Sequence, residues 1–280
     1  NGVQEKINRI QPFSLIEKIL KQEIQKKFKG VNFDLLYGLP GQTLETFRET
    51  IRLTKILSPE RITLIKYAHI PNIRKHMKMI KESDLPNDED LPYMFVESTE
   101  SLMKDGYSWV GIDHFAKSDD ELAIASANKN VYRNFGGETP GFTKDIISLG
   151  PTSTSSFGNN YFQATYSLPE YKDSIDNDIF PISKHYELTE DDRVRRACNF
   201  SLQCNQILDI KSINNEYNIQ FNQYFKKEIY RLKAFEEKGF LEYTDDFITV
   251  TTSGRYFIRH ICQVFDDFLN DDSTYKIHGN

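Results

Sequence analysis

Acidic and histidine side chains stand beside short apolar runs of the 280-residue sequence. Asp34 lies between Phe33 and Leu35, where a carboxylate is costly to bury unless a hydroxyl, an amine or an N–H group partners it. A ligand-binding acid and an acid with a purely structural role fit this pattern equally well. The adjacent Asp113 and His114 have the residue types for acid–base or metal chemistry. A histidine without a second ligand at metal-site spacing is more typical of structure, so we expect no metal site.

The cysteines do not form a recognisable metal motif. Cys198 and Cys204 are six residues apart in a segment of helical periodicity and do not share a helix face, and Cys262 is remote in the sequence. A C-x2-C pair is absent. We expect small core residues with reduced thiols, as in a cytoplasmic protein, and the sequence contains neither a secretory signal nor a bilayer-spanning apolar run.

The elements that must position these residues have the pattern of an α/β sheet. Residues 31–37 and 62–68 are short apolar runs typical of buried strands, and residues 43–57 between them have helical spacing. Strands separated by a helix predict parallel pairing, and ligands of such sheets gather at the carboxyl ends of the strands. We therefore place Asp34 and the tripeptide Tyr67-Ala68-His69 at that edge.

A helix over 88–105 and a third strand over 108–116 are predicted next. Residues 133–160 are rich in Gly, Ser, Thr and Asn, which predicts loops through which the backbone approaches a ligand. A polar stretch from about 167 to 184 is the predicted linker.

Beyond the linker the pattern becomes mainly helical. Helices over about 190–208 and 219–238 are followed by a β-hairpin around 244–246 and a last helix, an order that resembles a winged-helix unit. We expect two domains, 1–166 and 185–275.

The charge balance argues against a nucleic-acid partner. The chain has 35 Lys and Arg against 41 Asp and Glu, a net charge of −6. The winged-helix-like part has the same sign of charge, so it lacks the basic surface that phosphate contacts need. The basic stretch 74–81 either meets an anionic substrate or is a solvated face, and the sequence leaves both alternatives open.

Several longer motifs are more specific. They are Phe33-Asp34-Leu35-Leu36-Tyr37-Gly38-Leu39-Pro40-Gly41-Gln42-Thr43, Tyr67-Ala68-His69-Ile70-Pro71, Gly111-Ile112-Asp113-His114-Phe115-Ala116, Asp119-Asp120-Glu121-Leu122-Ala123 and Thr252-Ser253-Gly254-Arg255. Together they resemble the oxygen-independent coproporphyrinogen III oxidases (coproporphyrinogen dehydrogenases), which are radical S-adenosylmethionine enzymes of haem synthesis. The aspartate-histidine-phenylalanine motif favours the oxidase over a related haem chaperone.

The resemblance implies a fold and a reaction. The fold is α/β, with the last strands of an incomplete (β/α)6 radical-SAM partial barrel, followed by a mainly helical, winged-helix-like C-terminal domain. The reaction is oxidative decarboxylation of two propionates of coproporphyrinogen III to vinyl groups, giving protoporphyrinogen IX. S-Adenosyl-L-methionine and a 4Fe-4S cluster are the implied cofactors, and an electron donor is the implied partner. The full-length protein is expected to be a cytoplasmic monomer without a membrane span.

The resemblance also implies which residues bind the cofactor. Arg9 and Asp34 match positions that contact S-adenosylmethionine, and Ala68 matches a backbone contact to its adenine region. Some members of the family hold a second S-adenosylmethionine, and the matching positions here are Phe135, Gly136 and Thr154.

The sequence departs from the family at several points. The family's C-x3-C-x2-C cluster motif and its G-G-G-T-P segment are absent. We therefore expect a C-terminal portion of such an enzyme, inactive by itself, with the cluster ligands in an N-terminal segment and no nameable catalytic residue. Glu138-Thr139 replaces a Tyr-Thr pair and Thr154 replaces an isoleucine, which disfavours the second ligand site. The alternative is a non-catalytic tetrapyrrole-binding or haem-chaperone-like interaction module of the same family.

Overall fold

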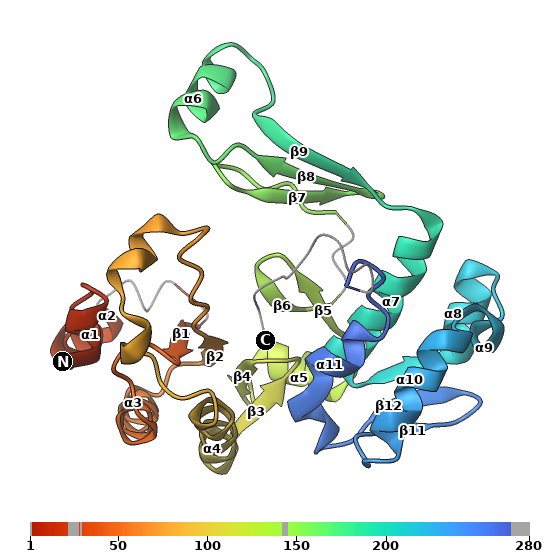
Figure 1. Ribbon diagram of the computed structural model, residues 1–280, viewed down its shortest axis with the longest axis horizontal. Helices are drawn as coiled ribbons and strands as arrows, with labels where there is room; N and C mark the ends of the chain where they lie inside the picture. The colour runs from red at the N-terminus through yellow and green to blue at the C-terminus, as the bar shows by residue number, and fades with distance from the viewer. Residues whose placement is uncertain (1, 22–27, 29, 142–144, 270–280) are drawn as a thin grey trace. The chain divides into compact units, whose positions relative to one another are not determined.

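The computed structural model describes residues 2–21, 28, 30–141 and 145–269 (Figure 1). The chain divides into two compact units, and the boundary lies between Ala127 and Asn128. The hairpin that follows the boundary belongs to the second unit, since the backbone N–H of Val131 donates to Asn205 Oδ1 over 3.2 Å. This division differs from the predicted domains 1–166 and 185–275, which stay a prediction.

The first unit contains a four-stranded mixed sheet with the strand order β1-β2-β4-β3. Its elements are α1 Gly2–Lys6, α2 Phe13–Lys21, β1 Asn32–Tyr37, α3 Leu44–Leu57, β2 Arg61–Lys66, the 3₁₀ helices Lys75–Met79 and Glu82–Asp84, α4 Asp90–Lys104, β3 Tyr107–Val110, β4 His114–Lys117 and α5 Glu121–Ala127. β1 and β2 are parallel and in register from Asn32 opposite Arg61 to Tyr37 opposite Lys66. The predicted strand–helix–strand unit is therefore confirmed.

The predicted single strand over 108–116 is wrong, because this segment forms a hairpin. The chain reverses after Val110 through Gly111, whose φ of 55° lies in the left-handed region that glycine tolerates. β4 then pairs antiparallel with both β3 and β2. The periodicity of the segment could not reveal the turn because both arms are apolar.

One face of this sheet is covered by helices, and the other face is exposed along β1. α3 and α4 pack side by side on the covered face (Figure 1), and their buried side chains include Phe47 and Met94. From the strands, Ile62, Leu64 and Phe115 complete this core. Along β1 the exposure alternates from residue to residue, which follows from the two-residue period of a strand.

The second unit contains three small antiparallel sheets, β5-β6, β7-β8-β9 and β10-β12-β11. Its elements are β5 Val131–Asn134, β6 Gly137–Pro140, β7 Thr154–Phe157, β8 Asn160–Ala164, α6 Leu168–Asp176, β9 Ile182–Glu187, α7 Glu190–Asn205, β10 Ile207–Asp209, α8 Ile210–Tyr217, α9 Phe221–Tyr224, α10 Lys226–Glu236, β11 Leu241–Tyr243, β12 Phe247–Val250, the 3₁₀ helix Gly254–Phe257 and α11 Ile258–Gln263.

Two predictions about the middle of the chain are wrong. The glycine- and serine-rich residues 133–160 contain strands, and the polar residues 167–184 contain α6 and the start of β9 instead of a linker. Ser167 caps α6 with its side chain, Pro169 stands at the beginning of the helix, and β9 pairs with β8. All six residues of β9 are exposed, so it has no apolar alternation that would have marked it as a strand.

The helical C-terminal part is confirmed in outline. α7 begins after Thr189 as predicted, and β11 and β12 form the predicted hairpin. The predicted helix over 219–238 is divided at Phe225, whose ring is fully buried against Phe221 and Phe265. α8 and β10 were not predicted. The winged-helix description stays a prediction.

Candidate functional site

A small polar cluster lies on the face of the first unit's sheet opposite α3 and α4, with Asn32 and Asp34 exposed and Thr63 buried. Asn32 and Asp34 lie on β1, and Thr63 of β2 stands opposite Asp34 in the parallel register. Asn32 Nδ2 donates to Asp34 Oδ1 over 2.7 Å and to Thr63 Oγ1 over 3.1 Å. Asp34 is exposed, so its carboxylate remains accessible to a ligand as well. Asn32 and Thr63 were not singled out from the sequence. The strand period could have indicated Asn32, two residues before Asp34, whereas only the register indicates Thr63.

The predicted position of Asp34 at the end of its strand is wrong. The strand continues three residues further to Tyr37, and the chain turns at Gly38, where φ is 83°. Buried Gln42 holds this turn, since its Oε1 accepts hydrogen bonds from the backbone N–H groups of Gly38 over 2.6 Å and Leu39 over 3.1 Å. Gln42 therefore has a structural reason to stand where it does in the motif.

Ala68 and Arg9 also belong to the first unit. Ala68 is exposed and follows the end of β2 by two residues, where the backbone N–H of Tyr67 donates to Tyr37 O over 2.8 Å. Arg9 is exposed after α1, and its Nε donates to Gln11 Oε1 over 3.3 Å. The predicted location of Ala68 at the carboxyl edge of the sheet is thus confirmed, whereas Arg9 stands outside the sheet.

The residues predicted for a second ligand all belong to the second unit. Phe135 and Gly136 form the turn between β5 and β6, and Thr154 begins β7. The Phe135 ring meets the ring of Tyr161 on β8 edge to face, with centroids 5.3 Å apart. Thr154 Oγ1 accepts a hydrogen bond from Gln163 Nε2 of the same sheet over 3.4 Å. Phe135 is exposed and Thr154 is half-buried.

Glu138 does not bring an isolated negative charge to this region. It stands opposite Arg133 in the β5–β6 register, and Arg133 Nη1 forms an ion pair with Glu138 Oε1. The Glu138 carboxylate is fully buried, and a buried charge requires such a partner. The replacement of the family's Tyr-Thr pair by Glu138-Thr139 therefore counts less against a second ligand site, because the charge of Glu138 is compensated within the hairpin.

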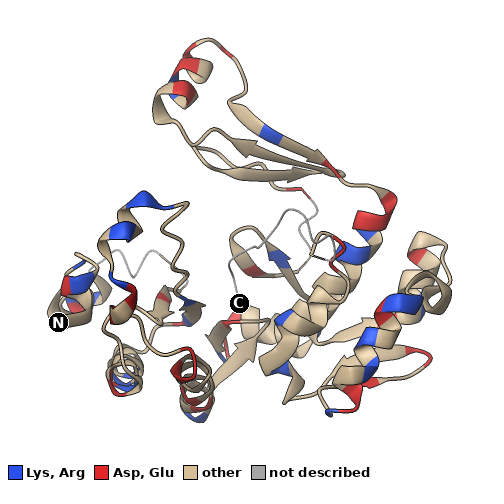
Figure 2. Ribbon diagram, viewed as in Figure 1, with Lys and Arg blue, Asp and Glu red and all other residues tan. Residues whose placement is uncertain are grey.

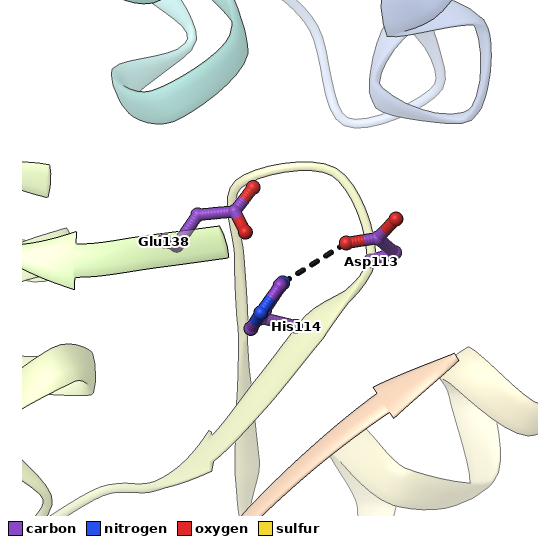
Figure 3. A group of neighbouring side chains, drawn as sticks. All are labelled: Asp113, His114 and Glu138. Atoms are coloured by element: carbon purple, nitrogen blue, oxygen red, sulfur yellow. Dashed lines mark hydrogen bonds and ion pairs between the residues drawn. The ribbon is translucent and has the colours of Figure 1, made fainter. Parts of the chain in front are cut away.

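The predicted Asp113–His114 pair forms at the turn between β3 and β4 (Figure 3). His114 Nδ1 and Asp113 Oδ1 are 2.9 Å apart, and both side chains are largely buried. His114 stands opposite Thr63, so it shares the face of the sheet that carries Asp34. Glu138, also drawn in Figure 3, belongs to the second unit. The arrangement suits proton transfer or the orientation of a polar ligand.

The cysteines are core residues, as predicted. Cys198, Cys204 and Cys262 are buried and form no disulfide. Burial raises the pKa of Cys204 and of Cys262 to about 12, and it raises the pKa of Cys198 further. Among the described residues, no cysteine belongs to a group of three side chains that could hold a metal, so these thiols do not fit an iron–sulfur cluster.

Comparison with known proteins gives these features a context. Residues 188–257 match the model of the HemN C-terminal domain. The chain is 38% identical to an oxygen-independent coproporphyrinogen III oxidase of Synechocystis, covering 98% of this chain and 60% of the relative. It is 35% identical to one of Thermostichus vulcanus, covering 97% of this chain and 84% of the relative.

The chain belongs to the oxygen-independent coproporphyrinogen III oxidase family. Its mixed α/β fold matches the solved HemN structure from Escherichia coli, a radical SAM enzyme, with a TM-score of 0.91 at 34% identity. That match covers 95% of this chain and 62% of the solved chain. The chain spans about 60% of the length of the first relatives it matches. In the part that the structure describes, no helix has the length and apolar character needed to cross a membrane.

Proposed function

We propose that this chain is the C-terminal portion of a radical S-adenosylmethionine enzyme that converts two propionates of coproporphyrinogen III to vinyl groups. The observation that carries the proposal is the TM-score of 0.91 to the HemN structure over 95% of the chain. The relatives' names supply the substrate, because a fold alone does not identify one.

The described residues fit one of the two cofactors. Asp34 and Asn32 offer exposed oxygen and nitrogen atoms, and the buried Thr63 accepts a hydrogen bond from Asn32. The exposed donor set suits the hydroxyl and amino groups of S-adenosylmethionine. The buried cysteines do not fit the cluster. The cluster ligands are therefore proposed to lie in residues that this sequence does not contain.

S-Adenosylmethionine, when bound and reduced, supplies the radical that removes a hydrogen atom from a propionate side chain. In the proposed mechanism this chain contributes placement. Asp34, held by Asn32, orients the cofactor, and Ala68 offers backbone at the neighbouring strand end. The Asp113–His114 pair, on the same face as Asp34, orients the substrate through a ring nitrogen.

A chimera tests the proposal. The N-terminal 40% of the Synechocystis relative that lies outside the match is joined to this chain. Iron and sulfide, a one-electron reductant and an electron acceptor are supplied without oxygen. We expect cleavage of S-adenosylmethionine and formation of protoporphyrinogen IX, and no turnover by this chain alone. A chimera with the cluster cysteines changed to alanine is the matched control. A cluster-bearing chimera that cleaves no S-adenosylmethionine would contradict the proposal.

The second candidate is a non-catalytic tetrapyrrole-binding or interaction module of the same family. It is favoured by one observation, namely that the thiols of the described residues are all buried and unsuited to a cluster. The chimera distinguishes the two functions. An inactive chimera, together with coproporphyrin binding by the chain, would favour the module.

A further inference from the structure

A run of cations follows β2 at the carboxyl edge of the first unit's sheet. Residues 70–81, here called the basic segment, contain four Lys or Arg, one His and no Asp or Glu, although the whole chain has a net charge of −6. In Figure 2 this segment is marked by blue near the start of its 3₁₀ helix. The side chains of Arg74, Lys75, Lys78 and Lys81 are all exposed.

The cations of the basic segment have no acidic partner in the part of the chain that the structure describes. Among the residues that the structure describes, Arg74, Lys75, Lys78 and Lys81 make no ion pair, whereas other exposed lysines do. Asp84, shortly after the segment, forms an ion pair with Lys6, with Nζ and Oδ1 2.7 Å apart. The four charges therefore remain available to an external anion.

Both ends of the segment are tied to the loop after β1. Before it, the backbone N–H of Tyr67 donates to Tyr37 O over 2.8 Å, and after it, the N–H of Gly41 donates to Asp84 O over 2.6 Å. Inside it, the Met77 sulfur accepts a hydrogen bond from the backbone N–H of Ile70 over 3.4 Å. The cations are thus held beside the strand ends, the edge at which α/β sheets bind ligands.

Apolar side chains are exposed among these cations. Met79 is 88% exposed and Ile73 is 68% exposed. Exposed apolar side chains are common on protein surfaces, but Ile73 and Met79 stand beside the four cations, and this combination complements an amphiphilic ligand. A tetrapyrrole that bears several propionates is such a ligand, because it combines an apolar ring with carboxylates at its rim.

We propose that the basic segment binds the propionate carboxylates of the tetrapyrrole substrate, with Lys75 and Lys78 as carboxylate contacts and Ile73 and Met79 against the ring. The inference deepens the proposed function and rests on it. Single exposed ion pairs are weak, so recognition requires several carboxylates at once. The affinity should therefore rise with the number of carboxylates and fall with salt.

The test measures porphyrin binding by the 280-residue chain itself. The probes are coproporphyrin III, with four carboxylates, and deuteroporphyrin IX, with two, followed by fluorescence. For K75Q/K78Q we expect coproporphyrin affinity to fall about five- to thirtyfold, the loss of two modest ionic contacts. The preference for coproporphyrin over deuteroporphyrin should shrink at the same time.

The matched control is K226Q/K227Q, which removes the same charge from two exposed lysines of α10. It should bind coproporphyrin as the unaltered chain does. Unfolding midpoints of both variants verify that each is folded. Phosphatidylserine-containing vesicles test the competing ligand: loss of vesicle binding by K75Q/K78Q with unchanged porphyrin binding would overturn the inference in favour of a lipid surface.

The outcomes separate this inference from the proposed function. If the unaltered chain binds coproporphyrin and K75Q/K78Q binds it equally well, the inference fails and the proposed function stands. If the unaltered chain does not bind coproporphyrin and the chimera does not convert it, both fail.

Discussion

At the scale of single residues, the chemistry depends on which face of a strand a side chain occupies. Asp34 lies in an apolar run, yet it is exposed, because alternate residues of β1 point away from the helices that cover the other face. The Asp34 carboxylate can therefore meet a ligand at the surface, and the fold does not have to bury its charge. Gly254, in the motif Thr252-Ser253-Gly254-Arg255, is required for a steric reason. A Cβ there would collide with the backbone oxygen of Phe240, so only glycine fits.

The first prediction concerns Asp34. In the chimera, Asp34→Asn keeps the shape of the side chain but removes its charge. We expect S-adenosylmethionine to bind about tenfold more weakly, the usual effect of losing a hydrogen bond to a charged group. Isothermal titration measures it, with Asp88→Asn, an exposed aspartate of the same unit, as the control. Equal affinity of both variants would remove Asp34 from the cofactor site.

At the scale of elements, local capping sequences fix helix starts that the apolar pattern leaves vague. α7 begins at a capping box in which the Thr189 side chain accepts from the Asp192 backbone and the Asp192 side chain accepts from the Thr189 N–H over 2.9 Å. Tyr186 also donates to Asp192 over 2.9 Å. Burial by itself would raise the pKa of Asp192, but the hydrogen bonds from Thr189 and Tyr186 outweigh it and lower that pKa.

This arrangement predicts an acid-dependent loss of stability. Because the pKa of Asp192 is lower in the folded chain than in the unfolded chain, its carboxylate stabilises the fold above the unfolded value near 4. That contribution disappears as the pH falls through the folded value. Asp192→Asn should therefore cost about 1 kcal/mol of unfolding free energy at pH 7 and progressively less below about pH 4.

Urea unfolding at a series of pH values measures this difference. Asp245→Asn, in the exposed turn between β11 and β12, makes the same change of charge and is the control. If the difference between Asp192→Asn and the unaltered chain were the same at pH 3 and pH 7, the capping interpretation would be wrong.

At the scale of the whole molecule, the chain is two units whose cores are built separately. Cys198, Cys204 and Cys262 are all buried in the second unit, so their reactivity reports whether the core of that unit is intact. Burial raises the pKa of Cys262 to about 12, so little reactive thiolate is present at neutral pH.

Thiol reactivity is therefore predicted to report unfolding. With a disulfide reagent at pH 8, the native chain should lose less than about a tenth of its thiols in the time that the chain in guanidinium loses them all. Absorbance of the released reagent measures it. Rapid reaction of one thiol in the native chain would show that the core around α7 and α11 is open.

The sequence by itself determined the family, the parallel β1–α3–β2 unit, the start of α7 and the β11–β12 hairpin. These depend on local signals: a dense motif, an apolar period and capping residues. It also identified Asp34, Ala68 and the Asp113–His114 pair as candidate site residues. Thr63, the neighbour of Asp34 on β2, stayed unnoticed, because strand register is not written in any single segment. Asn32 stands two residues before Asp34 on the same strand, so the two-residue period of a strand could have indicated it.

Only the tertiary structure decided the rest. The strands of residues 131–187 lack apolar alternation, so pairing with a neighbour, and not propensity, makes them strands. The hairpin at Gly111 depends on a positive φ at that glycine, and the two apolar strands on either side gave no sign of the turn between them. The position of the basic segment beside the strand ends depends on hydrogen bonds between residues far apart in the sequence, such as Gly41 to Asp84. Non-local contacts of this kind set the geometry of the site, and one segment read alone does not contain them.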